Sequence, residues 1–573
     1  MSRARGALIA AGFCCTLGAA CGDTPALEAS GANRGDDDDD GGQGAPNDES
    51  PGAGTGGGGG VPPEQEFESK FLSPVATGRY VWVANPTSNR VAYIDAVSLR
   101  VNLVEAGHEP THLAAVPSPE DDVALALNVR SKDATILRAR PPGVVESERV
   151  LVPSPANAWG VSPDGRWAVA WTDTTKLVAP DPVDGFQSIT VLGLGATPKT
   201  STELSVGYRP VAVAFDQGST RAFVITQDGV SVVALGAAPA IERSVPIARP
   251  GATTRDVVIT PDGAYALVRF EGESAVTLVP LAGGGEAVAV ALPGEVTDLD
   301  LAPGGAVGVA VVRSTGQVAL LPMPEVVADP TALRLLTLGA GSGAGSAALA
   351  PLGGTGFFYT NATPNPALTV VDTAVEAPSP LTLLLRAPVK AVFPTDDAKH
   401  ALVLHDALPA DAGGTGGGTG GGTGGGTGGG TGGGTGGGGT GGSGGGGSKY
   451  AASMSLVPAD GSAPPRIVGL EQAPAAVALA PGGAHALVAT GDALAAAGKY
   501  MLYVTDFPSL RVREVPLASA PTAAGVVAGA GRGYVAQRHP DGRITFVDFA
   551  SGEVRTLTGF ELAAGVVDGS EQP

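Results

Sequence analysis

The sequence predicts an all-β protein, a β-propeller of four-stranded antiparallel blades. A turn of the Pro-Asp-Gly type recurs about every 45 residues, which is the spacing typical of propeller blades. Short segments rich in valine and alanine flank each turn, and no long segment has the 3.6-residue period of a helix. The turns begin at residues 119, 163, 216, 261, 303, 351, 394, 481, 529 and 567.

Each repeat unit is expected to contain four strands. In the first unit, three of them are predicted at residues 80–85, 90–95 and 100–104. The segment before each turn carries small side chains, as in residues 211–214 and 477–480. Small side chains fit a strand that is crowded against a central axis, so we expect these segments to be the innermost strands of the blades.

The number of turns and the two ends of the array predict how the ring is built. Ten turns predict about ten blades, within a range of seven to ten, in one ring or in two. The first unit is expected to start at its second strand, residues 80–85, and the chain ends with a segment of the innermost type at 560–567. We therefore expect the C-terminal strand to pair with the N-terminal blade, because closure removes exposed sheet edges.

Composition limits the class of protein. Hydrophobic residues make up 43% of the 573 residues, which is enough for a core despite 88 glycines and 47 prolines. The formal net charge of −21 argues against a nucleic-acid partner, since phosphates must be neutralised by lysine and arginine.

The only cysteines are Cys14, Cys15 and Cys21, all at the start of the chain. Residues 1–21 combine a basic start with a short apolar run, too short to span a bilayer, and this pattern predicts an export signal. The sequence Leu17-Gly-Ala-Ala-Cys21 resembles a bacterial lipoprotein signal, although Gly18 stands where a larger apolar residue is usual. The resemblance implies lipid attachment at Cys21. The alternatives are plain cleavage after Ala20, or a cytoplasmic protein with an apolar start.

Two low-complexity segments divide the rest of the chain. Residues 22–66 are rich in glycine, proline and acidic residues and are expected to be a disordered tether. Residues 67–573 are expected to form the propeller, with a flexible Gly/Thr-rich insertion at 411–448. When the residues of this tract are not counted, the repeat spacing continues from the turn before it to the turn after it. We therefore interpret the tract as a loop within one array of repeats.

Some units match a known repeat. Residues 80–85 read Tyr-Val-Trp-Val-Ala-Asn, residues 88–95 read Ser-Asn-Arg-Val-Ala-Tyr-Ile-Asp, and Gly107-His-Glu-Pro110 follows. These residues, with Gly207 to Phe215, resemble the YVTN-type β-propeller repeat. The resemblance covers about residues 67–573, and it implies kinship with surface-layer and periplasmic propellers and, more distantly, with lactonases.

Three short motifs imitate functional sites. His108-Glu109-Pro110-Thr111-His112 matches the zinc-protease pattern, but Pro110 is incompatible with the helix that this pattern needs, so we interpret it as the ordinary turn of the repeat. The acidic run Asp36–Asp40 starts like a calcium loop but lacks the final glutamate, and a solvated tether is the better interpretation. The pattern around Ser443 lies within the Gly/Thr tract and is attributed to composition.

Catalytic chemistry of the lactonase type would need converging carboxylates or a metal near the axis. The predicted innermost strands offer only Asp298, Asp300 and Asp256, which are too few to name catalysts. We therefore predict no catalytic residue, no cofactor site and no metal site. Four further histidines are each expected to be hydrogen-bonded or exposed: His400, His405, His485 and His539.

The sequence favours an exported, lipid-anchored propeller that acts as a binding or scaffold module at the cell envelope, with the outer membrane favoured. It is expected to be monomeric, held to the membrane by its lipid, and to bind an unknown protein or small molecule through its loops. We expect the binding face to be the one that carries the insertion and the segment 173–185. The alternatives are a lactonase-like, metal-dependent hydrolase and a passive surface-layer component, because the fold does not choose among functions.

Overall fold

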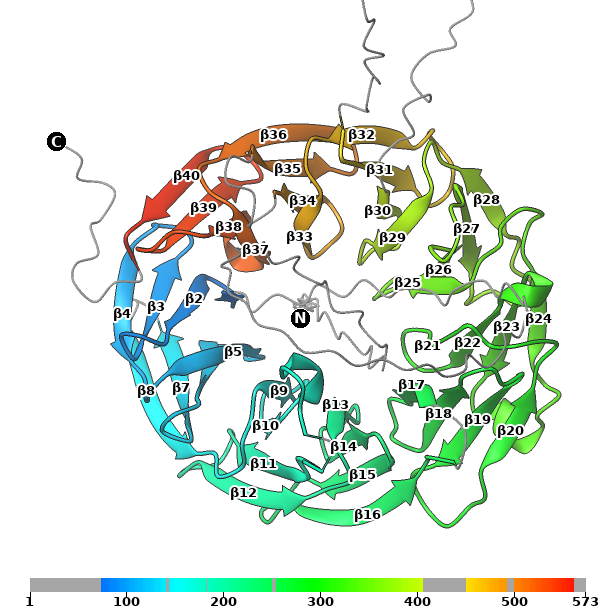
Figure 1. Ribbon diagram of the computed structural model, residues 1–573, viewed down its shortest axis with the longest axis horizontal. Coiled ribbons are helices and arrows are strands. Elements are labelled where there is room, and N and C mark those ends of the chain that lie inside the picture. The colour runs from blue at the N-terminus through cyan, green and yellow to red at the C-terminus, as the bar shows by residue number, and fades with distance from the viewer. Residues whose placement is uncertain are drawn as a thin grey trace, which may run out of the picture.

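The chain forms one ring of ten blades that follow each other in chain order (Figure 1). The computed structural model describes residues 74–140, 144–181, 183–249, 254–405, 450–491 and 499–560. Each blade is a four-stranded antiparallel sheet, and its strands run from the ring axis outward. The predicted fold class is therefore confirmed, with ten blades in a single ring.

The strands are grouped here by their place in the blade, in the order of blades 1 to 10. The innermost strands are β1 (Val75–Ala76), β5 (Pro110–Val116), β9 (Ala158–Val161), β13 (Pro210–Phe215), β17 (Thr254–Ile259), β21 (Asp298–Leu301), β25 (Ser346–Leu349), β29 (Val389–Pro394), β33 (Pro474–Leu479) and β37 (Pro521–Val527). The second strands are β2 (Tyr80–Asn85), β6 (Asp122–Asn128), β10 (Trp167–Trp171), β14 (Arg221–Thr226), β18 (Tyr265–Phe270), β22 (Val307–Val312), β26 (Thr355–Tyr359), β30 (His400–His405), β34 (His485–Thr490) and β38 (Arg532–Gln537).

The outer half of each blade is equally regular. The third strands are β3 (Arg90–Asp95), β7 (Asp133–Arg140), β11 (Ser188–Gly193), β15 (Gly229–Ala234), β19 (Ala275–Pro280), β23 (Gln317–Pro322), β27 (Ala367–Asp372), β31 (Ala452–Pro458), β35 (Tyr500–Asp506) and β39 (Arg543–Asp548). The outermost strands are β4 (Val101–Glu105), β8 (Val144–Leu151), β12 (Thr200–Ser205), β16 (Ala240–Pro246), β20 (Val288–Ala291), β24 (Arg334–Thr337), β28 (Leu381–Leu384), β32 (Arg466–Leu470), β36 (Arg511–Leu517) and β40 (Val554–Thr558).

Helix is nearly absent from the residues that the structure describes. The structure has one short α-helix, α1 (Glu325–Ala328), and three 3-10 turns, η1 (Thr174–Lys176), η2 (Arg313–Thr315) and η3 (Ala528–Ala530). No helix in the described part of the chain has the length and hydropathy needed to cross a membrane.

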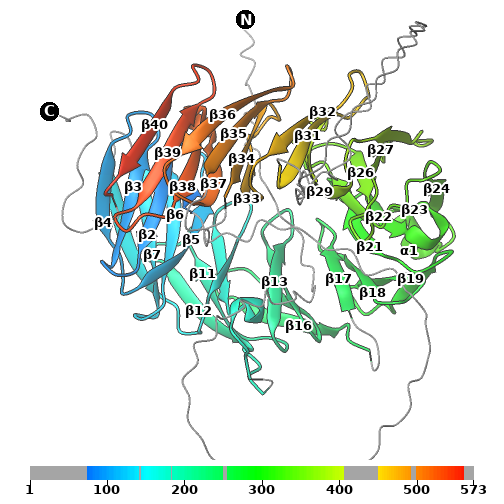
Figure 2. The same ribbon diagram turned by 45° about the horizontal axis from the view of Figure 1, so that its top comes forward.

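The core lies between the blades. Ten clusters of buried apolar side chains are found, one at each junction between neighbouring sheets, which stand side by side around the ring (Figure 2). The cluster between blades 4 and 5, for example, contains Phe223 and Phe270, both fully buried. Burial of this kind is the main favourable contribution to folding, and here it depends on each sheet having a neighbour on both faces.

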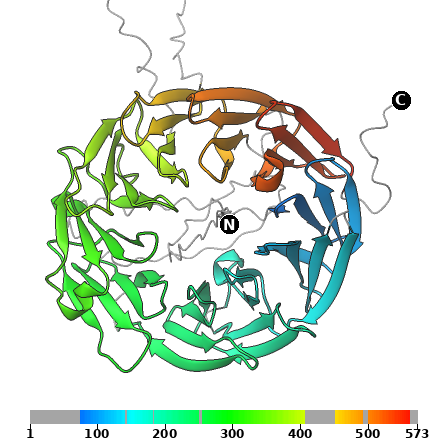
Figure 3. The ribbon, with the colours of Figure 1, turned by 180° about the vertical axis from the view of Figure 1, so that it is seen from behind.

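The ring closes between the first and the last blade, which lie side by side when the molecule is seen from behind (Figure 3). The hydroxyl of Tyr534 donates to the carbonyl of Pro74 at 2.6 Å, and Phe560 is buried in the cluster that joins the two blades.

The expectation that the first unit starts at its second strand is wrong. A short innermost strand, β1, pairs with β2 through Val75↔Trp82 and Ala76↔Val81, because the chain before Tyr80 already runs along that edge. The predicted closing strand at 560–567 lies outside the described residues, apart from Phe560.

The ring has two unlike faces. On the loop face lie the connections from the second to the third strand and from the outermost strand to the next blade. On the turn face lie the other two kinds of connection, which include the recurrent tight turns. Asp164 and Asp262 cap two of these turns: the Oδ1 of each accepts a backbone N–H at 3.0 Å, from Arg166 and Ala264. Both aspartates are thus turn residues.

Candidate functional site

The zinc-protease pattern does not lie on the helix that a zinc protease of this kind needs. Pro110 begins strand β5, so His108 lies in an exposed loop and His112 lies on a strand. Burial lowers the pKa of His112, and its Nδ1 has no hydrogen-bond partner within the described structure. Across the described residues, no group of three or more histidine, cysteine or acidic side chains is placed to hold a metal ion.

Two of the carboxylates named from the sequence come together on adjacent innermost strands. Asp256 on β17 is buried and forms an ion pair with Arg269, whose Nη1 also donates to the carbonyl of Val296 at 3.3 Å. Asp298 on β21 accepts the backbone N–H of Ala347 at 2.6 Å. Burial and the charge of Asp256 raise the pKa of Asp298 to about 7, so this carboxyl group can exchange a proton near neutral pH.

This acidic pair occupies a repeated position of the ring. This position is on the innermost strand, opposite the second-to-last residue of the second strand at its loop-face end. It is occupied by His112 in blade 2, by Asp256 in blade 5 and by Asp298 in blade 6. In blades 4, 8, 9 and 10 the residue at this register is small: Ala212, Ala391, Ala476 and Ala523. In blades 3 and 7 the small residues Ala158 and Ser346 pair with the last residue of the second strand. The titratable residues are therefore departures from the repeat, and the ring architecture does not require them.

The loop face carries a long connection that is held in place. Between β10 and β11, the turn η1 is capped by Asp173, whose carboxylate accepts the N–H of Thr175 at 3.0 Å. Arg209 from the next blade donates from Nη2 to the carbonyl of Asp181 at 2.6 Å. The fixed loop leaves Val178 fully exposed and Val183 83% exposed.

Polar side chains of the third strands position the loop face. The Oγ1 of Thr135 accepts the N–H of Gly107 at 3.2 Å, and the Oγ of Ser231 accepts that of Gly207 at the same distance. In blade 8 the buried His405 makes this link, with its Nδ1 at 2.9 Å from the carbonyl oxygen of Pro388 and its Nε2 at 2.8 Å from the Oγ of Ser455. Each contact ties a blade to the connection that enters it from the previous blade.

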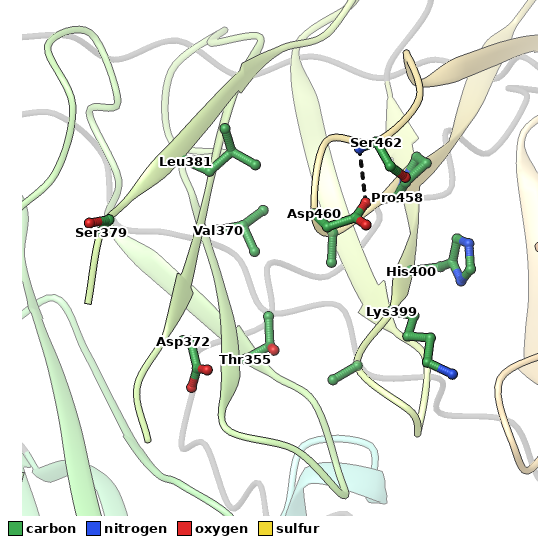
Figure 4. A pocket seen from close by; sticks show the side chains of 12 residues that line it. Thr355, Val370, Asp372, Ser379, Leu381, Lys399, His400, Pro458, Asp460 and Ser462 are labelled. Atoms are coloured by element: carbon green, nitrogen blue, oxygen red, sulfur yellow. Dashed lines mark hydrogen bonds between the residues drawn. The ribbon is translucent and has the colours of Figure 1, made fainter. Parts of the chain in front are cut away.

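A cleft of about 420 Å³ opens on the turn face between blades 7 and 8 (Figure 4). Its apolar wall is formed by Val370 and Leu381 from blade 7, and Asp372 lies at the end of the same sheet. On the opposite side the turn between β31 and β32 contributes Asp460, whose carboxylate accepts the N–H of Ser462 at 2.9 Å. Hydrogen bonding by Ser462 lowers the pKa of Asp460, which is therefore charged at neutral pH.

The remaining predicted residues divide into two groups. Cys21, the run Asp36–Asp40 and Ser443 lie outside the described residues, and so does the insertion, although β30 and β31 on either side of it pair with each other in blade 8. Three of the four other histidines are hydrogen-bonded, as expected: His405, His485 and His539. His400 differs, since its Nδ1 is buried without a partner in the described structure while its ring stacks on Phe507.

Sequence reasoning missed the cleft. One signal could have indicated it: the outermost strands of blades 6 and 8 begin with Arg334 and Arg466, whereas that of blade 7 begins with Leu381. The substitution is visible only once the strands are aligned by register, which the irregular repeat spacing hides.

Comparison with known proteins identifies no family and gives only distant structural likenesses. No family model matches the chain, and no curated protein matches it. Three solved structures are similar: the hydrazine synthase of Kuenenia stuttgartiensis (18% identity, 55% of this chain and 99% of that chain, TM-score 0.30), the dihydro-heme d1 dehydrogenase NirN in complex with DHE (13%, 80% and 76%, 0.39), and a eukaryotic initiation factor (12%, 78% and 96%, 0.49). Likenesses this distant carry no argument about function.

Proposed function

We propose that the protein is an exported, lipid-anchored β-propeller that binds a partner at the cell envelope through its loop face. The observation that carries the proposal is the anchored loop between β10 and β11, because it presents Val178 and Val183 to solvent while Arg209 fixes its backbone. A rigid ring that displays fixed loops is a common arrangement for recognition.

The expected anchor is supported by the sequence. A basic start and a short apolar run precede Cys21, and the chain has no cysteine after it. A protein that enters an oxidising compartment benefits from lacking stray thiols. Metabolic labelling with a fatty acid tests this part: label is expected on the wild type and on Cys15→Ala, and it is expected to be absent from Cys21→Ala. Label on Cys21→Ala would refute the lipid anchor.

The binding face is tested separately by crosslinking in intact envelopes. Val178→Asp together with Val183→Asp is expected to remove the crosslinked partner, since a charged side chain cannot enter an apolar contact. Leu352→Asp is the matched control, because Leu352 is 61% exposed but lies in a turn-face loop between β25 and β26. If the control removes the partner and the valine variant does not, the loop face is the wrong face.

A second candidate is a lactonase-like hydrolase, and one observation favours it. Asp256 and Asp298 are brought together on the innermost strands, and Asp298 can carry a proton near neutral pH. Purified protein that contains a stoichiometric metal and hydrolyses lactones would support this candidate. Retention of turnover in Asp298→Asn would show that the pair is not the catalyst.

A further inference from the structure

Arginines join neighbouring blades at four junctions on the turn face. In each case the arginine lies on the outermost strand of its blade. It pairs with the residue two positions before the last residue of the third strand. Its Nη1 donates to a backbone carbonyl in the turn between the third and outermost strands of the next blade. The pairs are Arg243 with Gly283, Arg334 with Glu376 at 2.7 Å, Arg466 with Leu510 at 2.8 Å, and Arg513 with Gly552.

A fifth arginine contacts the corresponding turn of the next blade, but it lies on a second strand and not on an outermost strand. Arg532 begins the second strand of blade 10 and pairs with Asp548 across that sheet. Its Nη1 donates at 2.6 Å to the carbonyl of Ala96, which lies in the corresponding turn of blade 1. A guanidinium thus lies between a strand-end carboxylate and the next blade's turn.

Blade 7 lacks an arginine at both of these positions, as blades 3 and 5 also do. Leu381 pairs with Val370, at the register that Arg334 and Arg466 occupy in blades 6 and 8. Thr355 pairs with Asp372, at the register that Arg532 and Asp548 occupy in blade 10. The cleft of Figure 4 lies at this junction, and both Leu381 and Thr355 line it.

The groups that would receive a guanidinium are still present. Asp372 corresponds to the ion-paired Asp548, and the turn that contains Asp460 corresponds to the turn that contains Ala96. Lys399 at the edge of the cleft is paired with Asp397 at 3.4 Å. The cleft therefore combines two carboxylates with an apolar wall that could cover the stem of a long side chain.

We propose that this cleft binds the guanidinium group of an arginine side chain from a protein partner. A guanidinium is planar, carries five N–H donors, and pairs with carboxylates and carbonyls more effectively than an ammonium does. The chain's net charge of −21 also attracts a basic partner. The proposal goes beyond the function proposed above and does not depend on the loop face.

A second cleft supports the argument by contrast. It lies between blades 2 and 3, where the arginine position is taken by Glu146. That cleft already contains cations of the chain itself, Arg138 and Arg140, and both pair with Asp121. Of these two clefts, the one between blades 7 and 8 has no arginine in its lining.

The experiment titrates N-acetyl-arginine amide against the full chain and follows binding by calorimetry, with N-acetyl-citrulline amide as the uncharged probe of the same shape. We expect saturable binding of the arginine derivative only. Asp372→Asn is expected to weaken it at least about tenfold, the effect of losing one charge-assisted hydrogen bond. Leu381→Arg is expected to abolish it, because the new side chain fills the cleft from within the chain.

Two controls keep the result interpretable. Asp506→Asn alters the equivalent carboxylate of blade 9, where Arg513 already fills the junction, and it is expected to leave binding unchanged. Thermal melting of each variant shows whether it is folded, and Asp372→Asn tests the site without adding bulk. The proposal is overturned if no saturable binding is found, if citrulline binds equally well, or if Asp372→Asn binds like the wild type. None of these results bears on the loop face.

Discussion

Replacing Asp298 by asparagine is expected to flatten the pH dependence of the protein's thermal stability. The pKa of this carboxyl group is raised from its ordinary 3.8 to about 7, first by burial and then by the charge of Asp256. Between these pH values the folded protein holds a proton that the unfolded chain has released. The stabilisation is complete below pH 3.8 and is lost as pH rises towards 7, so stability falls with rising pH in this window.

The magnitude follows from the width of the window. From pH 5 to pH 7 the slope falls from about 1.4 to about 0.7 kcal/mol per pH unit, so the contribution changes by about 2.3 kcal/mol in all. Unfolding the roughly 430 described residues has an entropy of about 0.9 kcal/mol per kelvin, so the melting temperature is expected to fall by about 3 °C. This is an upper value, because Asp256 and Asp298 share the proton.

Melting curves of the wild type and Asp298→Asn at pH 5, 6, 7 and 8 test the prediction. The difference between the two proteins isolates this group from others that titrate in the same range. We expect the variant to lose the decline that the wild type shows between pH 5 and 7. Asp256→Asn serves as a second variant and is expected to melt lower at every pH, because it leaves Arg269 buried without its ion pair. A parallel decline in the wild type and Asp298→Asn would refute the reasoning.

Three further changes are expected to affect stability. His405→Ala leaves the buried Ser455 hydroxyl without its partner and is expected to cost about 1–3 kcal/mol in denaturant unfolding, whereas His405→Gln restores a donor and should recover part of it. Gly263→Ala places a Cβ 2.3 Å from a buried phenylalanine ring at φ +67°, so it is expected to melt lower than Gly304→Ala, which has a similar φ of +83° but open space; equal melting temperatures would contradict this. Arg466→Ala removes one hydrogen bond between blades 8 and 9 and is expected to cost about 1 kcal/mol, measured by the same unfolding assay.

The fold could be predicted from the sequence because its local signals are strong and repeated. Turns such as Pro261-Asp-Gly263 need a positive φ that glycine supplies, and strands such as Tyr265–Phe270 follow them directly. The first strand could not be predicted in the same way. Strand β1 contains only Val75 and Ala76, and its pairing depends on the edge that β2 offers and not on any pattern of its own.

The site was harder to predict, because it depends on contacts between blades. Asp256 and Asp298 could be named as the few acidic residues near innermost strands, but their proximity depends on the packing of blade 5 against blade 6. No sequence motif indicates the cleft between blades 7 and 8. Its signal is the absence of an arginine at Leu381, which has meaning only against the register of the other outermost strands.

Equivalent positions in the ten blades can be compared with one another, and this comparison is the main basis for identifying functional residues in this chain. Ten junctions face the same physical demands, so a residue that recurs at one register position is explained by the architecture. The arginines at Arg334 and Arg466 recur in this sense, and the alanine at Ala476 does too. Asp298 departs from the small residues at its register and costs stability through burial of an acidic group, and Leu381 stands where four other blades carry an arginine that contacts the next blade. A departure that costs stability is retained more easily where it serves another purpose, and for this reason experiments on this protein should begin at those two positions.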